Sequence, residues 1–149
     1  MFYSSTPLPP ALERLVQRFQ QTSDPKRKYE HLLWLTKRLP EFPAAAKIAN
    51  NKVPGCVSQV YITATLEDDK VTFQGDSDAQ ITKGLVALLI EGLSSLSPLE
   101  IQDLSPDFIT ATRLDVSLTP SRANGFYNIF QFMQHKATTC QFANMPSMS

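Results

Sequence analysis

The sequence has few of the side chains that bind metals and no excess of charge. It contains 2 cysteines and 2 histidines in 149 residues, scattered at Cys56, Cys140, His31 and His135. A structural zinc site uses several such ligands in recognisable pairs, so this scatter argues against one. The 14 basic and 14 acidic side chains balance. The basic surplus of a nucleic-acid-binding protein is therefore missing.

Segments for membrane insertion, export or nucleotide binding are missing too. No stretch approaches the ~18 uninterrupted apolar residues of a membrane span. Residues 1–10 lack the basic and apolar regions of a secretory signal, so we expect a cytoplasmic protein whose cysteines stay reduced. A disulfide between Cys56 and Cys140 is compatible with the count, but each residue is interpreted as a thiol first. Glycine-rich phosphate loops and the Gly-x-Ser-x-Gly motif are absent, which leaves no support for nucleotide-binding or serine-hydrolase classes.

The two parts of the chain carry opposite charge. Residues 1–52 have nine Lys or Arg against four Asp or Glu, a net of +5, and residues 53–149 have five against ten, a net of −5. The simpler interpretation is two solvated surfaces of opposite sign. The alternative is that one of them steers a charged protein partner.

The spacing of apolar residues predicts helices in the first third of the chain. One helical stripe over about residues 9–22 lies at i, i+3, i+4 and i+7, and consists of Leu12, Leu15, Val16 and Phe19. Asp24 followed by Pro25 is typical of a helix start and predicts a second helix to about residue 38. A short helical turn is expected at residues 44–48.

Residues 60–74 alternate between apolar and polar side chains, which predicts a β-hairpin with its turn at residues 67–70. A short strand at residues 52–53 is expected to pair beside it, because two strands alone are marginal. Grouped strands flanked by helices indicate an α+β fold. We expect a small antiparallel sheet of about three strands with helices packed on one face.

The second half of the chain is predicted to be helical. Residues 78–94 form the most apolar helix, which we expect to be the central core helix, with Ser77 as its N-cap and Gln80 three residues into it. Short helices should begin after Ser97 and Ser105, and a last helix at Pro120. Residues 138–149 are interpreted as a loose tail of a single domain formed by residues 1–137.

Cys56 is the leading candidate for a reactive group. Pro54 and Gly55 place it in or beside a tight turn, where a thiol is better exposed for reaction than on a helix stripe. The alternative is a small buried thiol that fills a gap in the core. Cys140 lies among polar residues and is interpreted as an incidental exposed thiol.

Charged residues offer weaker candidates. Arg122 follows the helix start at Pro120, where a basic group opposes the helix dipole, and this placement hints at an anionic partner such as a thiolate. The alternative is a solvated surface arginine. Asp76 and Asp78 form a candidate carboxylate pair, but their position at a helix start favours a capping role.

Four blocks of the sequence, in the same order, resemble the SufE family of sulfur acceptors. They are the segment from Asn50 to Tyr61 around Cys56, the segment Gly75–Ala79, the segment Lys83–Leu85, and the segment Leu118–Gly125. The resemblance runs from about Leu8 to Lys136. Tyr61 departs from the pattern, since the family commonly has tryptophan there.

The resemblance implies a role in iron–sulfur cluster assembly. A SufE-like protein accepts sulfur as a persulfide on its turn cysteine, here Cys56, from a pyridoxal-phosphate cysteine desulfurase that it also activates. It passes the sulfur to a scaffold protein and needs no cofactor or metal of its own. The matching motifs imply supporting roles for Gly55, Ser58, Gln59, Asp76 and Arg122, and the family fold is an α+β sandwich like that of IscU scaffolds.

Thiol exchange agrees with this implication, because a thiolate that attacks a sulfur–sulfur bond needs neither a triad nor a metal. Two alternatives stay open, a non-covalent desulfurase activator and a hydrolytic thiol enzyme in which Cys56 pairs with His31 or His135. A cluster scaffold would need more cysteines than this chain has. The sequence also leaves open whether the chain forms a homodimer. If Cys56 carries sulfur, we expect its loop to pack against Val53 and Val57 in the free protein.

Overall fold

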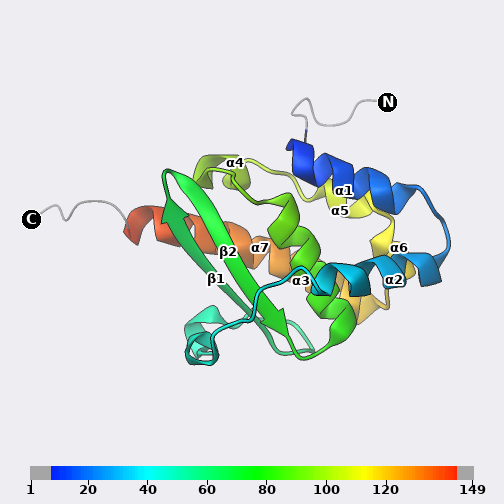
Figure 1. Ribbon diagram of the computed structural model, residues 1–149, viewed down its shortest axis with the longest axis horizontal. Helices are drawn as coiled ribbons and strands as arrows, with labels where there is room; N and C mark the ends of the chain where they lie inside the picture. The colour runs from blue at the N-terminus through cyan, green and yellow to red at the C-terminus, as the bar shows by residue number, and fades with distance from the viewer. Residues whose placement is uncertain (1–7, 144–149) are drawn as a thin grey trace, which may run out of the picture.

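The computed structural model describes residues 8–143 as an α+β fold (Figure 1). Its elements are α1 (Pro10–Gln20), α2 (Pro25–Thr36), the short 3-10 helices η1 (Ala44–Ala46) and η2 (Ala49–Asn51), β1 (Val60–Glu67), β2 (Lys70–Ser77), α3 (Gln80–Gly92), α4 (Pro98–Gln102), α5 (Asp107–Ala111), α6 (Leu114–Ser117) and α7 (Pro120–Ala143).

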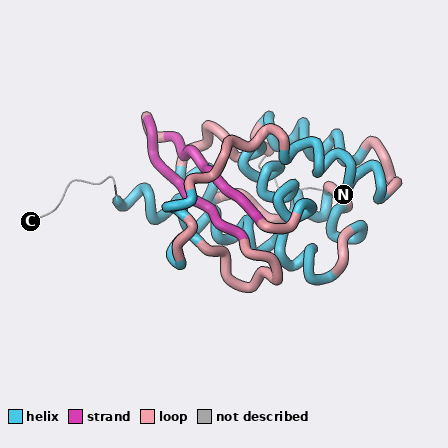
Figure 2. Tube along the Cα trace, turned by 60° about the horizontal axis from the view of Figure 1, so that its bottom comes forward, coloured by secondary structure: helices cyan, strands magenta, loops and turns pink. Residues whose placement is uncertain are grey.

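The sheet of the described residues is a two-stranded antiparallel hairpin. Its register runs from Val60 opposite Ser77 to Glu67 opposite Lys70. The buried side chains of β1 and β2 alternate with more exposed ones, so one face of the hairpin belongs to the core. That face packs against α3 and α7. Figure 2 shows the two strands as one hairpin with most of the helices to one side of it.

The third strand expected at residues 52–53 is reduced to a single antiparallel bridge between Lys52 and Tyr61. The Gly55 turn begins directly after it, so the pairing cannot extend. The prediction of the core helix is confirmed. α3 is the most apolar helix, and α1 and α2 cover it on one side while α7 crosses behind it (Figure 1).

Two helix predictions need correction. α3 begins after Ala79, which provides no side-chain cap, because Ser77 is still paired with Val60 in the sheet. The tail expected from residue 138 is helical as far as Ala143, and residues 144–149 lie outside the described part. Met133, Ala137 and Cys140 explain the extension, because they continue the inward stripe of the helix.

A buried lysine joins two helix ends. Lys28 on α2 is 2% exposed. Its Nζ donates to the carbonyl of Phe19, in the last turn of α1, and to that of Thr112, just after α5, at 3.0 Å. A cation at the carboxyl ends of helices satisfies their free carbonyls and their dipoles. Burial, and then the charge of Arg113, lowers the pKa of Lys28.

Within residues 8–143, no helix is both long and apolar enough to cross a membrane.

Candidate functional site

Cys56 lies in a tight loop that leads into β1. The backbone of Gly55 has a φ of +79°, a conformation that side chains with a Cβ rarely adopt. The N–H of Val53 donates to the carbonyl of Val60 at 2.8 Å and closes the loop. The sequence therefore builds a turn that presents the next residue, Cys56, at its end.

The turn rests on the first half of α7. Asn128 Nδ2 donates to the carbonyl of Gly55 at 3.0 Å, and Cys56 Sγ lies 3.9 Å from the carbonyl oxygen of Gly125, which accepts its weak hydrogen bond. A Cβ on Gly55 would lie 2.8 Å from Asn128 Nδ2. The positive φ therefore favours glycine at position 55, and a Cβ there would also displace the Asn128 amide.

A second contact holds the start of the loop further along α7. Lys136 Nζ donates to Asn51 Oδ1 at 2.7 Å, and Asn51 Nδ2 donates to the carbonyl of Ala46 at 2.8 Å. Lys136 also lies 5.5 Å above the ring of Phe132, and burial lowers its pKa. α7 thus supports the segment between η1 and Cys56 at two separate places.

The far end of the loop is tied to the segment between β2 and α3. The N–H of Gln59 donates to Asp78 Oδ1 at 3.0 Å, and the N–H of Asp78 donates back to the carbonyl of Gln59 at 3.2 Å. The Gln59 side chain accepts a hydrogen bond from the Tyr61 hydroxyl at 3.2 Å. The capping role expected for Asp78 is therefore wrong, because its carboxylate binds the loop of Cys56 instead.

Asp76 is an ion-pair centre and not a helix cap. Its carboxylate lies 3.2 Å from Lys47 Nζ and 3.4 Å from Lys83 Nζ. Burial alone would raise its pKa, but hydrogen bonds from Lys47 and the Ser77 backbone, with the charge of Lys83, lower it below its ordinary value. A shallow pocket of about 130 Å³ lies here, lined by Lys47, Gln59, Tyr61, Asp76, Ser77 and Asp78.

The Cys56 thiol is sheltered and electrically neutral. It is half-buried, and burial raises its pKa above the ordinary value. Of the two valines expected to cover the loop, Val53 is 2% exposed but Val57 is 87% exposed. The expectation for Val57 is wrong, because it projects from the surface beside the thiol. Ser58 is half-buried within the same turn.

Arg122 lies one turn before Gly125 on α7, so the two share a helix face. Its backbone N–H donates to the Thr119 hydroxyl at 3.4 Å. The guanidinium is exposed and makes no hydrogen bond or ion pair with any other residue in the part of the chain described. Burial alone accounts for the raised pKa of Cys56. A direct effect of Arg122 on the sulfur during transfer stays a prediction.

The other candidate residues are separate from Cys56. Cys140 lies fifteen residues beyond Gly125 on α7, about 22 Å along the helix, too far for a disulfide with Cys56. Both cysteines are free, and the interpretation of Cys140 as an exposed thiol is wrong, because it is half-buried and packs against the core. Neither His31 nor His135 is a hydrogen-bond partner of Cys56 in residues 8–143. No three His, Cys, Asp or Glu side chains in that range are grouped so that they could hold a metal ion.

Sequence reasoning missed Asn128 and Lys136, the two residues by which α7 holds the loop. Asn128 lies 73 residues from Gly55, and Lys136 lies 85 residues from Asn51. The only sequence signal for Asn128 is that it lies one turn after Gly125 on the same helix. That signal becomes informative only once the Cys56 loop is known to pack on this face of α7.

Comparisons with known proteins match most of the chain to one family. The family described as "SufE: Fe-S metabolism associated domain" matches residues 13–137. The chain is 66% identical over 134 residues to a SufE-like protein of Synechocystis, covering 90% of this chain and 84% of that protein. It is 39% identical to a "Cysteine desulfuration protein SufE" of Plasmodium vivax, covering 89% of this chain and 54% of that protein.

Other relatives are longer or more distant. A chloroplastic/mitochondrial SufE-like protein of Arabidopsis thaliana is 44% identical, over 87% of this chain and 35% of that protein. The solution structure of a hypothetical protein from Thermus thermophilus has a TM-score of 0.78 at 22% identity, and covers 91% of this chain and 99% of that one. That likeness shows the same fold.

Proposed function

The chain belongs to the SufE family, and on this premise we propose that Cys56 accepts sulfur from a cysteine desulfurase and carries it as a persulfide to an iron–sulfur assembly scaffold. The observation that carries the proposal is the position of the thiol. It follows a tight glycine turn, half-buried against α7, within the block that matches the family. The name of the Plasmodium vivax relative, a cysteine desulfuration protein, supports the same role.

The proposed step is a thiol–persulfide exchange. The Cys56 thiolate attacks the outer sulfur of a persulfide on the partner's cysteine, and a new sulfur–sulfur bond forms as the old one breaks. The partner's cysteine leaves as a thiolate and takes up the proton that Cys56 released. The transferred sulfur keeps its oxidation level, so no oxidant or reductant is consumed. Pyridoxal phosphate belongs to the desulfurase, where it generates that persulfide.

The loop would protect the sulfur between encounters. In the closed position, burial disfavours the thiolate, and Asn128 and Asp78 hold the loop by three hydrogen bonds. Net hydrogen-bond contributions are about 1 kcal/mol each, so a docked partner can replace them at modest cost. We propose that the loop swings out on docking and that Arg122, exposed on the same face, then lies beside the transferred charge.

The test is to incubate the protein with a purified desulfurase and cysteine and to weigh the peptides. We expect the Cys56 peptide to gain the mass of one sulfur atom, and Cys56→Ser to abolish this gain and the stimulation of the desulfurase. Cys140→Ser, the matched control, should leave both unchanged. Stimulation that survives in Cys56→Ser would instead indicate a non-covalent activator. Ester or peptide hydrolysis without a desulfurase would indicate a hydrolytic thiol enzyme.

The proposed setting is the cytoplasm, where thiols stay reduced.

A further inference from the structure

The outer face of α2 carries a stripe of basic and aromatic side chains that plays no part in the Cys56 site. Arg27, His31, Trp34 and Arg38 lie at i, i+4, i+7 and i+11, so they follow one line along the helix and its last turn. Trp34 is the chain's 1 tryptophan and is 47% exposed. Tryptophan is a common anchor in protein interfaces, because it presents a large apolar surface with one polar group.

Neighbouring rings and charges hold Trp34 in place. Its ring stacks on His31, with centroids 5.7 Å apart and planes 12° from parallel, and His31 in turn lies 4.6 Å from Phe19 of α1. The Arg38 guanidinium lies 5.4 Å from the Trp34 centroid and pairs with Glu91 of α3 at 2.5 Å. Such a fixed aromatic ring loses little entropy when a partner covers it.

His31 serves this arrangement as a neutral ring. Its Nε2 is buried and has no hydrogen-bond partner in residues 8–143. Burial first, and then the nearby Arg18, lowers its pKa, and the carboxylate of Glu91 opposes this in part. A neutral imidazole stacks on the indole and leaves the positive charge of the surface to the arginines.

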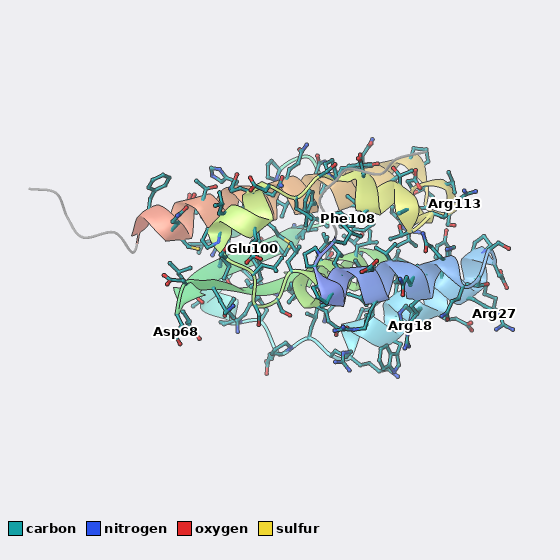
Figure 3. All side chains as sticks on the ribbon, turned by 90° about the horizontal axis from the view of Figure 1, so that it is seen from above. Arg18, Arg27, Asp68, Glu100, Phe108 and Arg113 are labelled. Carbon is teal, nitrogen blue, oxygen red and sulfur yellow. The ribbon has the colours of Figure 1, made fainter. Side chains whose placement is uncertain are left out.

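The surface around the stripe is basic. Arg18 of α1 and Arg27 of α2 lie on the side of the molecule opposite α7 (Figure 3). Between residues 10 and 38, three exposed acidic residues are outnumbered by six exposed basic ones, which are Arg14, Arg18, Lys26, Arg27, Lys37 and Arg38. These six residues supply most of the positive charge of the first 52 residues.

We propose that the α2 stripe, defined as Arg27, His31, Trp34 and Arg38, together with Arg18 of α1, docks an acidic segment of a protein partner with Trp34 as its anchor. The arginines attract the carboxylates of an acidic segment, and the exposed indole of Trp34 contacts an apolar side chain within that segment. The chain as a whole has no net positive charge, which disfavours a nucleic acid as the occupant.

The stripe and the Cys56 loop face different neighbours. α2 packs on α3, whereas the loop rests on α7. In Figure 3, α1 and α2 run along one side of the molecule and α7 along the other. A partner on the stripe therefore leaves the thiol open, and this proposal holds whether or not Cys56 carries sulfur.

The test uses the full chain and a fluorescein-labelled peptide of repeated Glu-Leu-Glu-Glu. We expect the unlabelled peptide to change the fluorescence of Trp34 and the labelled one to gain anisotropy, with affinity that falls as salt rises. Trp34→Ala and Arg18→Glu should each weaken binding on the order of tenfold or more. Lys70→Glu, on the distant hairpin turn, is the matched control and should bind as the wild type does.

Circular dichroism of each variant separates lost binding from lost folding, and Arg27→Gln, at an exposed position of the stripe, should also weaken binding. Equal binding of a peptide with glutamine for every glutamate would overturn the proposal. Unchanged affinity in folded Trp34→Ala and Arg18→Glu would overturn it too. So would a single-stranded oligonucleotide that binds more tightly and displaces the peptide, since it would make the occupant a nucleic acid.

Discussion

The side-chain amide of Asn128 donates a 3.0 Å hydrogen bond to the carbonyl of Gly55, the residue directly before the candidate sulfur-carrying cysteine. A helix that begins at Pro120 thereby holds a turn that lies more than seventy residues earlier in the chain. The hydrogen bond fixes the turn without touching the sulfur, so its loss should change how often the thiol is accessible and leave the thiol's chemistry intact.

Asn128→Ala should therefore release the loop. We expect iodoacetamide to label Cys56 faster than in wild type, in a Cys140→Ser background that leaves one thiol. The free energy of unfolding should fall by about 1 kcal/mol. Asn124→Ala, an exposed change one turn earlier on α7, is the control. Equal labelling rates in Asn128→Ala and wild type would mean that the bond does not hold the loop.

The two glycines on either side of the thiol should respond oppositely to alanine. At Gly55 a Cβ meets Asn128 at 2.8 Å and the φ is +79°, so Gly55→Ala should destabilise the protein by roughly 1–2 kcal/mol. At Gly125 a Cβ lies 3.8 Å from Cys56 Sγ, an ordinary contact. Gly125→Ala should raise the melting temperature, because alanine favours the helix by ~1 kcal/mol, and slow Cys56 labelling. A lower melting temperature in Gly125→Ala would contradict this.

The pH dependence of Cys56 labelling should follow from burial. Because burial raises the pKa of the thiol in the folded protein, the labelling rate should rise with pH at a higher midpoint than in the unfolded chain. A raised pKa stabilises the fold below the unfolded pKa, and this stabilisation is lost as pH rises through the folded pKa. Thiolate absorbance and melting curves on the alkaline side measure both effects. A midpoint below that of the unfolded chain would show that a cation stabilises the thiolate.

Arg122→Ala distinguishes a role in the free protein from a role during transfer. Since the guanidinium is exposed and burial sets the pKa of Cys56, we expect the thiol titration and the melting temperature to stay unchanged. Sulfur acceptance from the desulfurase should be slower, because the positive charge is missing where the transferred sulfur arrives. Arg122→Lys should recover part of the rate. A lower thiol pKa midpoint in wild type than in Arg122→Ala would show that the residue already acts in the closed loop.

Asp76→Asn should cost stability only where the carboxylate is ionised. Its pKa is lowered in the fold, so its contribution is present above the unfolded pKa and is lost as pH falls through the folded pKa. Both partners are partly exposed, which limits the loss at neutral pH to roughly 1 kcal/mol or less. Urea unfolding of wild type and variant should converge at acid pH. A constant difference across pH would mean that packing, not charge, is responsible.

Local patterns predicted much of the fold. The stripe from Leu12 to Phe19, the Asp24 cap and the alternating hairpin each correspond to an observed element, because each depends on neighbours a few residues away. The expected third strand failed because pairing at Lys52 competes with the turn at Gly55. The site was predictable only as Cys56 and its turn. Its supports, Asn128 and Asp78, were not, because a polar side chain carries no sign of which distant backbone group it will reach.

The buried amine of Lys28 provides an internal reference for labelling experiments on Cys56. Lys28 closes the ends of α1 and α5 and is almost inaccessible, so an amine reagent can reach it only when that helix junction comes apart. Cys56 becomes accessible when a single loop lifts from α7. Labelling both residues in one sample would separate the motion of the loop from the opening of the whole fold, and would show which of the two a bound partner accelerates.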